Sequence, residues 1–114
     1  MGGEIAVPSG QVVTYQDTIS TAPGPGGLVI RFRFVAPAIA RDGGTVTPEV
    51  AQEDMEFLCR TYALPRLSET GPVPDQVVIS LADRELPFGE ASPDATQFFE
   101  AYRVEGATCI WEAF

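Results

Sequence analysis

The chain has 114 residues, 45% of which are hydrophobic, and its excess of acidic residues gives a net charge of -9. This length and composition predict one globular domain over residues 1–114, and the charge disfavours nucleic acid and anionic membrane surfaces as partners. The sequence contains no His, Lys or Asn, which excludes Ser-His-Asp catalysis, Schiff-base lysines, Walker A motifs and His-rich zinc sites.

Four segments precede the predicted helix. In chain order they are an extended entry segment at 1–10, a short strand at 11–19, a turn at 21–27 and a strand at 28–36. The last of these is the clearest strand, because its residues alternate between two distinct faces. The expected core face carries Leu28, Ile30, Phe32, Phe34 and Ala36. Arg31 and Arg33 fall on the other face, which we expect to be partly exposed.

A single helix is predicted over residues 48–63. Thr47 is typical of an N-cap and Pro48 of the first helical position, and acidic residues follow near the positive end of the helix dipole. The expected buried stripe consists of Val50, Ala51, Met55, Phe57, Leu58 and Tyr62. We expect Pro65 to prevent the helix from continuing.

The C-terminal part of the chain predicts further strands. In chain order there are a loop at 68–75, a strand at 76–82, an irregular stretch at 86–89 and a hairpin of 96–104 with 107–113. The apolar strand is expected at the centre of the sheet, covered on both faces. Glu105-Gly106 suits the two-residue turn of the hairpin. In that register Glu100, Tyr102 and Trp111 share one face, which we assign to the core because it is the more apolar.

Together these elements predict an α+β fold with two layers, in which one main helix packs on a mainly antiparallel sheet of about five strands. No run of 18 or more apolar residues occurs, so we predict no transmembrane segment. The first residues, MGGEIAVPSGQ, lack the basic and apolar regions of a signal peptide, which by itself favours a cytoplasmic protein.

Five segments resemble a small bacterial family, of alphaproteobacterial type, that is known only as a domain of unknown function. They are RFRFVAPAIARDGG, DMEFLCRTYALP, QVVISLADRELPFGE, ATQFFEAYR and CIWEAF, and the resemblance covers residues 5–114. Members of this family carry a signal peptide ahead of a segment like EIAVPSGQ, so the resemblance implies a mature exported chain. It favours a periplasmic or secreted protein over a cytoplasmic one, and it implies no reaction.

Cys59 and Cys109 are the two cysteines of the sequence. Cys59 lies at the edge of the predicted helix stripe and Cys109 on the core face of the hairpin, so both can point into the helix–sheet interface. With the export that the resemblance implies, we expect a disulfide between them. The alternative is a pair of buried free thiols that never meet.

Asp54 and Glu100 are the candidate catalytic residues. Asp54 falls inside the apolar arc of the helix, and Glu100 lies beside Trp111 and Tyr102 on the hairpin. Burial beside aromatic rings favours the protonated form of a carboxyl group, as a general acid requires. Two such carboxylates facing each other would form an acid/base pair. Alternatively, Asp54 bonds a backbone amide or an arginine, and Glu100 reaches solvent.

Arg31, Arg33 and Arg103 are the candidate ligand-binding residues. On one face of the sheet their guanidinium groups would suit a carboxylate or another anion. The alternative is a solvated face of charge pairs with the abundant acidic residues. We predict no cofactor and no metal site, since the acidic residues lack EF-hand spacing and the glycines lack a dinucleotide-binding pattern.

These observations favour a small exported protein that is not an enzyme and acts as an accessory or binding module. We expect a protein partner, which the sequence does not identify. One alternative is a small carboxylate-dependent enzyme using Asp54 and Glu100, and another is a structural subunit of an envelope complex. Convergence of Asp54 and Glu100 in one pocket distinguishes the enzyme, and a large contiguous apolar patch distinguishes the subunit.

Overall fold

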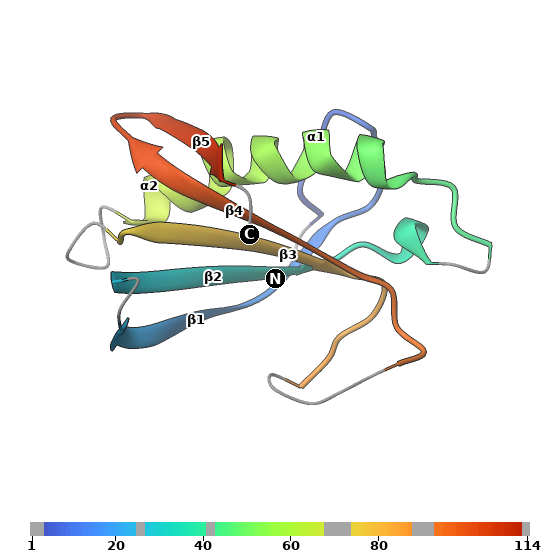
Figure 1. Ribbon diagram of the computed structural model, residues 1–114. Helices are drawn as coiled ribbons and strands as arrows, with labels where there is room; N and C mark the ends of the chain where they lie inside the picture. Colours follow the sequence, from blue (N-terminus) through green and yellow to red (C-terminus); the bar gives the residue numbers. More distant parts are fainter. Residues whose placement is uncertain (1–3, 25–26, 41–42, 68–73, 88–92, 113–114) are drawn as a thin grey trace.

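A computed structural model describes residues 4–24, 27–40, 43–67, 74–87 and 93–112. Five strands form one sheet in the spatial order β1-β2-β3-β4-β5, and a helical segment lies across one face of it (Figure 1). The predicted α+β architecture of one main helix on a five-stranded, mostly antiparallel sheet is therefore confirmed.

The sheet is antiparallel except between its second and third strands. The strands are β1 (Thr14–Gly24), β2 (Gly27–Val35), β3 (Gln76–Ala82), β4 (Gln97–Glu105) and β5 (Thr108–Glu112). β2 and β3 run parallel, and every other neighbouring pair is antiparallel. Parallel neighbours need a long crossover connection, which the helical segment supplies. The chain therefore places its helical layer directly over the central strands.

The core lies between this helical layer and the sheet. Ile30, Phe32 and Phe34 are buried, which confirms the core face predicted for β2. Almost every residue of β3 is buried, and β3 is the middle strand, which confirms its predicted central position. Each large apolar side chain in this layer stabilises the fold by about 1.5–3 kcal/mol relative to an exposed one.

The helix begins as predicted. In α1 (Pro48–Leu58) the Thr47 side-chain oxygen accepts the backbone N–H of Val50, which caps the first turn. Val50 itself is exposed, contrary to its predicted place in the stripe, because it lies in the first turn at the outer end of the helix. Asp54 is completely buried, as its position in the apolar arc predicted.

Pro65 does not end the helix, contrary to the prediction. A π-helical turn, η2 (Cys59–Ala63), follows α1 and continues into α2 (Leu64–Leu67), so the helical segment has 20 residues. In a regular α-helix the proline ring clashes with the carbonyl four residues earlier. The wider π-turn shifts the hydrogen bonds to the fifth residue, as in the bond from the Leu64 N–H to the Cys59 carbonyl. This shift relieves the conflict with Pro65.

β1 extends further than predicted. Residues 21–24, expected as part of a turn, continue the strand, and Gly24 pairs with Gly27. β1 is an edge strand, where Pro23 needs no ladder partner for its missing N–H. Gly27 has a φ of +85°, and a Cβ atom there would overlap the Asp75 carboxylate. The backbone at Gly27 therefore requires glycine.

The β4–β5 turn lies one residue later than predicted. Glu105 pairs with Thr108, so Gly106-Ala107 forms the turn, with Gly106 at a φ of +59°. This change moves each cross-strand partner by two residues, so the predicted faces remain. Trp111 is nevertheless 57% exposed, which makes its predicted place in the core wrong. β5 is an edge strand with a neighbour on one side only, and the large indole extends beyond the cover that one neighbour provides.

Candidate functional site

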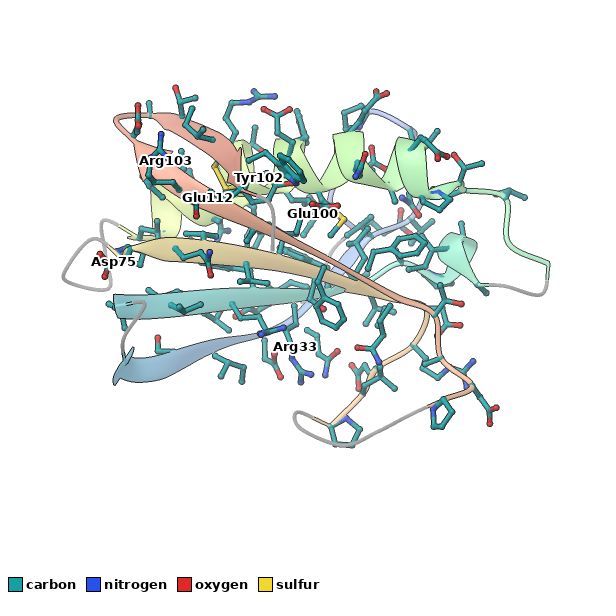
Figure 2. The ribbon with its side chains drawn as sticks, viewed as in Figure 1. Arg33, Asp75, Glu100, Tyr102, Arg103 and Glu112 are labelled. Carbon is teal, nitrogen blue, oxygen red and sulfur yellow. A yellow bond between two sulfur atoms is a disulfide. The ribbon has the colours of Figure 1, made fainter. Side chains whose placement is uncertain are left out.

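A hollow of about 280 Å³ lies between α1 and the β4–β5 hairpin, open to solvent. It is lined by Gln52 and Glu56 from the helix and by Glu100, Tyr102 and Trp111 from the hairpin. We call it the Trp111 hollow. Figure 2 shows Glu100 and Tyr102 on the side of β4 that faces α1. The site contains one predicted catalytic residue, Glu100, and none of the predicted arginines.

Glu100 is held in the hollow by neutral donors. The Trp111 indole N–H donates to Oε1 of Glu100 at 2.5 Å, and the Gln52 side-chain amide donates to Oε2 at 3.1 Å. These two bonds fix the indole ring beside the carboxylate. Because neither donor carries a positive charge, neither bond neutralises the charge of Glu100.

Tyr102 contributes a buried phenol that lies within range of the charges of Glu100 and Glu56. The residue is 1% exposed, yet it lines the site. Within the described part of the chain, no group forms a hydrogen bond with the Tyr102 hydroxyl. Burial raises the pKa of Tyr102 well above its usual range, and the charges of Glu100 and Glu56 raise it further. The hydroxyl is therefore protonated at neutral pH and available to a ligand.

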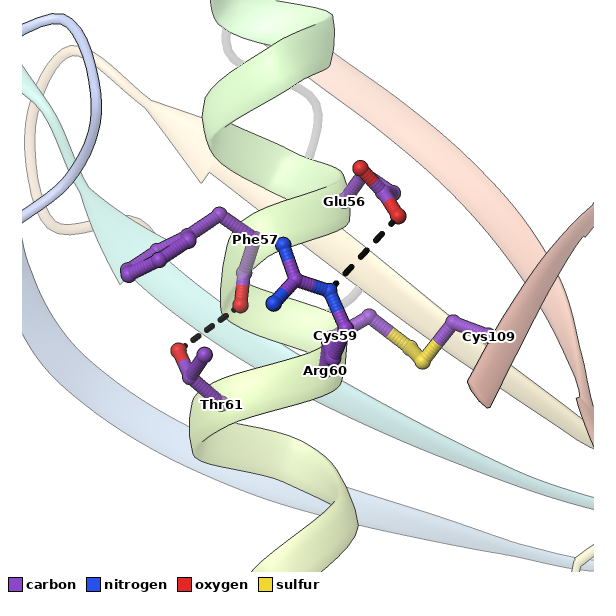
Figure 3. The surroundings of a disulfide bond; sticks show 6 residues. All are labelled: Glu56, Phe57, Cys59, Arg60, Thr61 and Cys109. Atoms are coloured by element: carbon purple, nitrogen blue, oxygen red, sulfur yellow. Dashed lines mark hydrogen bonds and ion pairs between the residues drawn. A yellow bond between two sulfur atoms is a disulfide. The ribbon is translucent and has the colours of Figure 1, made fainter. Parts of the chain in front are cut away.

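Glu56 supplies the second carboxylate of the hollow. Its Oε2 lies 3.8 Å from Nε of Arg60, one helical turn further on (Figure 3). Both side chains are about half exposed, so this pair contributes little to stability. The Arg60 guanidinium also lies over the ring of Phe57. The five described lining residues thus include two carboxylates and no basic side chain.

A disulfide joins the two sides of the hollow. Cys59 in η2 is bonded to Cys109 in β5, 50 residues later (Figure 3), which confirms the predicted pairing. Both cysteines are buried. Cys59 follows Glu56 by three positions on the helix, and Cys109 precedes Trp111 by two on the strand. Because these spacings keep side chains on one face, the bridge brings Glu56 and Trp111 to the same place.

Asp54 lies on the opposite flank of the helix. Its carboxylate accepts hydrogen bonds from the backbone N–H and the hydroxyl of Ser9 and from the side-chain amide of Gln11. Asp54 is two positions from both Gln52 and Glu56, which corresponds to about 160° around the helix axis. The structure therefore does not bring Asp54 and Glu100 together. Asp54 instead ties the N-terminal segment to α1.

Arg31 and Arg33 lie on the sheet face away from the helix. Nε and Nη2 of Arg33 donate to the two carboxylate oxygens of Asp17, at 2.6 and 2.8 Å. This bidentate contact raises the pKa of Arg33 and lowers the pKa of Asp17. Arg31 lies over the ring of Phe99, and burial lowers its pKa. The contacts of Arg33 are thus the cross-strand charge pair that we weighed as the alternative to an anion site.

Arg103 belongs to the same face, at the hairpin end of β4. Its guanidinium contacts Glu105 at 2.5 Å and Glu112 at 3.7 Å. No three metal-ligating side chains gather into a cluster among the described residues. A larger hollow, of about 530 Å³, lies near Ile39 and Phe98, and its described lining has no ionisable side chain. Of these two hollows, the Trp111 hollow combines charge, aromatic surface and hydrogen-bonding groups.

The comparison with known families identifies the chain's relatives but no activity. Residues 1–114 match one family model, which carries the description "Family of unknown function (DUF6497)". The chain belongs to this family. No curated protein and no solved structure matches the chain. None of the helices in the described ranges has the length and apolar composition that a membrane-spanning helix requires. The function must therefore be argued from the site of this family member.

Sequence reasoning missed the helix side of the site. The helical periodicity predicts Gln52 and Glu56 on the side of α1 opposite its apolar stripe, which we expect to face solvent. The available signal was their spacing to Cys59, since residues 52, 56 and 59 follow one line along a helix. The expected disulfide to Cys109 then implies that this line faces the hairpin, and with it Trp111.

Proposed function

We propose that this protein is a small exported binding protein without catalytic activity, and that its ligand binds in the Trp111 hollow. The observation that supports a binding role most directly is the separation of Asp54 from Glu100. The acid/base pair predicted from the sequence needs the carboxylates of Asp54 and Glu100 to converge. Here Asp54 accepts its hydrogen bonds from the N-terminal segment, whereas Glu100 accepts from Trp111 and Gln52.

The composition of the hollow supports binding through a small, preformed site. Trp111 is 57% exposed, and its indole N–H is held by Glu100. Tyr102 adds the hydroxyl of a buried ring. Exposed aromatic side chains with fixed orientation supply large contact area at a small entropic cost. Ligand-binding sites typically combine such surfaces with a few positioned polar groups.

Export is supported by the disulfide and by the earlier family resemblance. Disulfides persist in oxidising compartments and are rare in the reducing cytosol. The Cys59–Cys109 bridge joins two buried sulfurs inside the helix–sheet interface. A role as a structural subunit is less well supported, because the exposed large hydrophobic side chains are dispersed over five segments. They are Val12, Tyr15, Val50, Phe99 and Trp111.

Binding without catalysis is tested with a ligand panel. Because Trp111 is the single tryptophan of the sequence, its indole N–H resonance and its fluorescence report on the hollow alone. We expect at least one class among amino acids, short peptides, sugars and nucleotides to shift this resonance, and the bound compound to be recovered with unchanged mass. A compound that is recovered chemically altered would contradict the proposal, as would a panel that leaves the resonance unmoved.

Export is tested in the native cells. The cells are fractionated with a thiol-alkylating reagent present, and the protein is then denatured and weighed. We expect the protein outside the cytosolic fraction with no alkyl group on Cys59 or Cys109. Protein confined to the cytosol with both thiols alkylated would refute export, and would leave the binding proposal to its own test.

A further inference from the structure

We propose that the Trp111 hollow binds a cationic nitrogen group, a guanidinium or a primary ammonium carried on an apolar stem. This inference rests on the proposed binding function and specifies its ligand class. The two carboxylates of the hollow come from separate elements, Glu56 from α1 and Glu100 from β4, and they face one space. A cation placed between them interacts favourably with both at once.

The aromatic wall of the hollow favours an organic cation over a metal ion. The indole of Trp111 lines the site, and its N–H is engaged by Glu100, which fixes the ring. The face of an indole attracts guanidinium and ammonium groups through its quadrupole. It also packs against the methylene groups of a long cationic side chain. A metal ion would instead require several oxygen ligands converging on one point.

Tyr102 provides an observation that is independent of the acidic residues. Its side chain is buried and lines the hollow within range of the charges of Glu56 and Glu100, and no described residue forms a hydrogen bond with its hydroxyl. The hydroxyl oxygen is not fully enclosed, so a group in the open hollow can reach it. A hydroxyl that opens onto two carboxylates is completed by a ligand N–H, which donates to the hydroxyl oxygen while its charge is balanced by Glu56 and Glu100.

Charge and size exclude the other ligand classes. An anion is repelled by both carboxylates and by a net charge of -9. A neutral apolar group would desolvate the carboxylates without pairing them. The volume of about 280 Å³ is at the lower limit of the range of about 300–1,000 Å³ that suits drug-sized molecules. The hollow therefore suits one charged side chain or a small free amine.

The binding experiment uses oxidised, ¹⁵N-labelled protein and four probes. They are n-butylguanidinium, N-acetyl-arginine methylamide, its neutral analogue N-acetyl-citrulline methylamide, and N-acetyl-glutamate methylamide. We expect both cations to shift the Trp111 indole resonance with a Kd of about 1 mM or tighter. Added salt should weaken their binding. The citrulline probe is expected to bind at least about fivefold more weakly than the arginine probe, and the glutamate probe is expected not to bind.

Variants assign the effect to the hollow. Glu56→Gln should weaken binding of the arginine probe about three- to tenfold. The matched control Glu53→Gln removes the same charge outside the hollow and should change the Kd by less than about twofold. Tyr102→Phe keeps the ring and removes the hydroxyl, so it should weaken binding while leaving the unfolding midpoint unchanged or raised. Retained amide spectra show that each variant is folded.

The outcomes separate this inference from the proposed function. If the citrulline probe binds as tightly as the arginine probe, the cation assignment fails and binding in the hollow stands. If neither cation shifts the Trp111 resonance, or if Glu56→Gln binds like the parent protein, the cation assignment fails, and the wider ligand panel decides the binding function. Equal affinity for the two cations identifies a small free cation as the ligand. Tighter binding of the arginine derivative identifies a side chain of a protein segment.

Discussion

The two flanks of α1 each carry a carboxylate and differ in what surrounds it. On one flank Asp54 is completely buried and accepts three hydrogen bonds from Ser9 and Gln11. On the other, Glu56 is half exposed and faces Glu100 across the Trp111 hollow. The first carboxylate has its bonding capacity met from within the chain. The second has only a long, exposed contact with Arg60, outside the hollow, to offset its charge.

This difference shows why burial of a carboxylate alone is a poor guide to function. Asp54 is the more deeply buried residue, and sequence patterning made it a candidate for catalysis. Its full set of internal donors indicates a structural role, because a satisfied buried group stabilises the fold. The hollow has the opposite character, with a hydroxyl that no described residue pairs and a carboxylate, Glu100, whose hydrogen-bond donors are neutral. Groups left incomplete by the fold are the ones available to a ligand.

The disulfide lies on the hollow side of the helix, and its loss is expected to be among the largest effects on stability. Replacing Cys59 and Cys109 by Ala together, or reducing the bridge, should lower the free energy of unfolding by about 3–4 kcal/mol through loss of the loop constraint. Denaturant titrations with and without reductant measure this, and Trp111 fluorescence follows the hollow. Equal midpoints in the two conditions would show that the bridge constrains neither the fold nor the hollow.

Leu58 lies in the buried apolar stripe of α1. Leu58→Ala should cost about 2–5 kcal/mol, because it removes buried methyl groups and leaves a cavity. Val50→Ala, at an exposed position of the same helix, should change the stability by less than about 0.5 kcal/mol. A loss below about 1 kcal/mol for Leu58→Ala in urea titration would mean that the buried face of the helix is assigned wrongly.

Asp54 and Glu56 form a matched pair across the two flanks. Asp54→Ala leaves the donors of Ser9 and Gln11 without an acceptor and should destabilise the protein by about 3 kcal/mol. Glu56→Ala should cost less than about 0.5 kcal/mol, since its contact with Arg60 is long and exposed. Thermal unfolding of the two variants compares them directly. Similar losses would remove the contrast between a structural and a functional flank.

Asp17 provides a reference for the other carboxylates, because it is paired with a cation, the Arg33 guanidinium. The Arg33 guanidinium lowers the pKa of Asp17 in the folded state, so the pair adds stability above the unfolded pKa, near 4. That stability is lost as pH falls through the lowered folded pKa. Asp17→Asn should cost about 1 kcal/mol at neutral pH after allowance for the exposure of Asp17. The cost should vanish toward pH 2 in acid titrations, and a cost that grows in acid would reverse the sign.

Glu100 is expected to show only a small change in stability. Glu100→Gln retains one acceptor for the Trp111 N–H but loses the acceptor for Gln52. We expect a loss of about 0.5 kcal/mol at neutral pH, since the site is partly exposed. Calorimetry of the variant measures the change. A variant that is more stable than the parent protein would mean that Glu100 is held at a cost to the fold, and would restore it as a candidate general acid.

The sequence alone determined the elements whose signals are local. The strand 28–36, the capped start of the helix at Thr47 and the central strand 76–82 depend on alternation, capping chemistry and apolar runs, and each occurs where predicted. The faces of the hairpin were also predictable. Moving its turn by one residue shifts each partner by two, and side chains on a strand repeat every two residues.

Only the tertiary structure decided where the carboxylates meet their partners. Ser9 and Gln11 are more than 40 residues from Asp54 along the chain, and no periodicity links them. The wider turn that carries the helix past Pro65, and the exposure of Trp111 on an edge strand, likewise depend on packing rather than local preference. Asp54 and Glu100 looked alike in the sequence because burial can be inferred from a pattern. Hydrogen-bond partners cannot, because they come from segments that folding brings together.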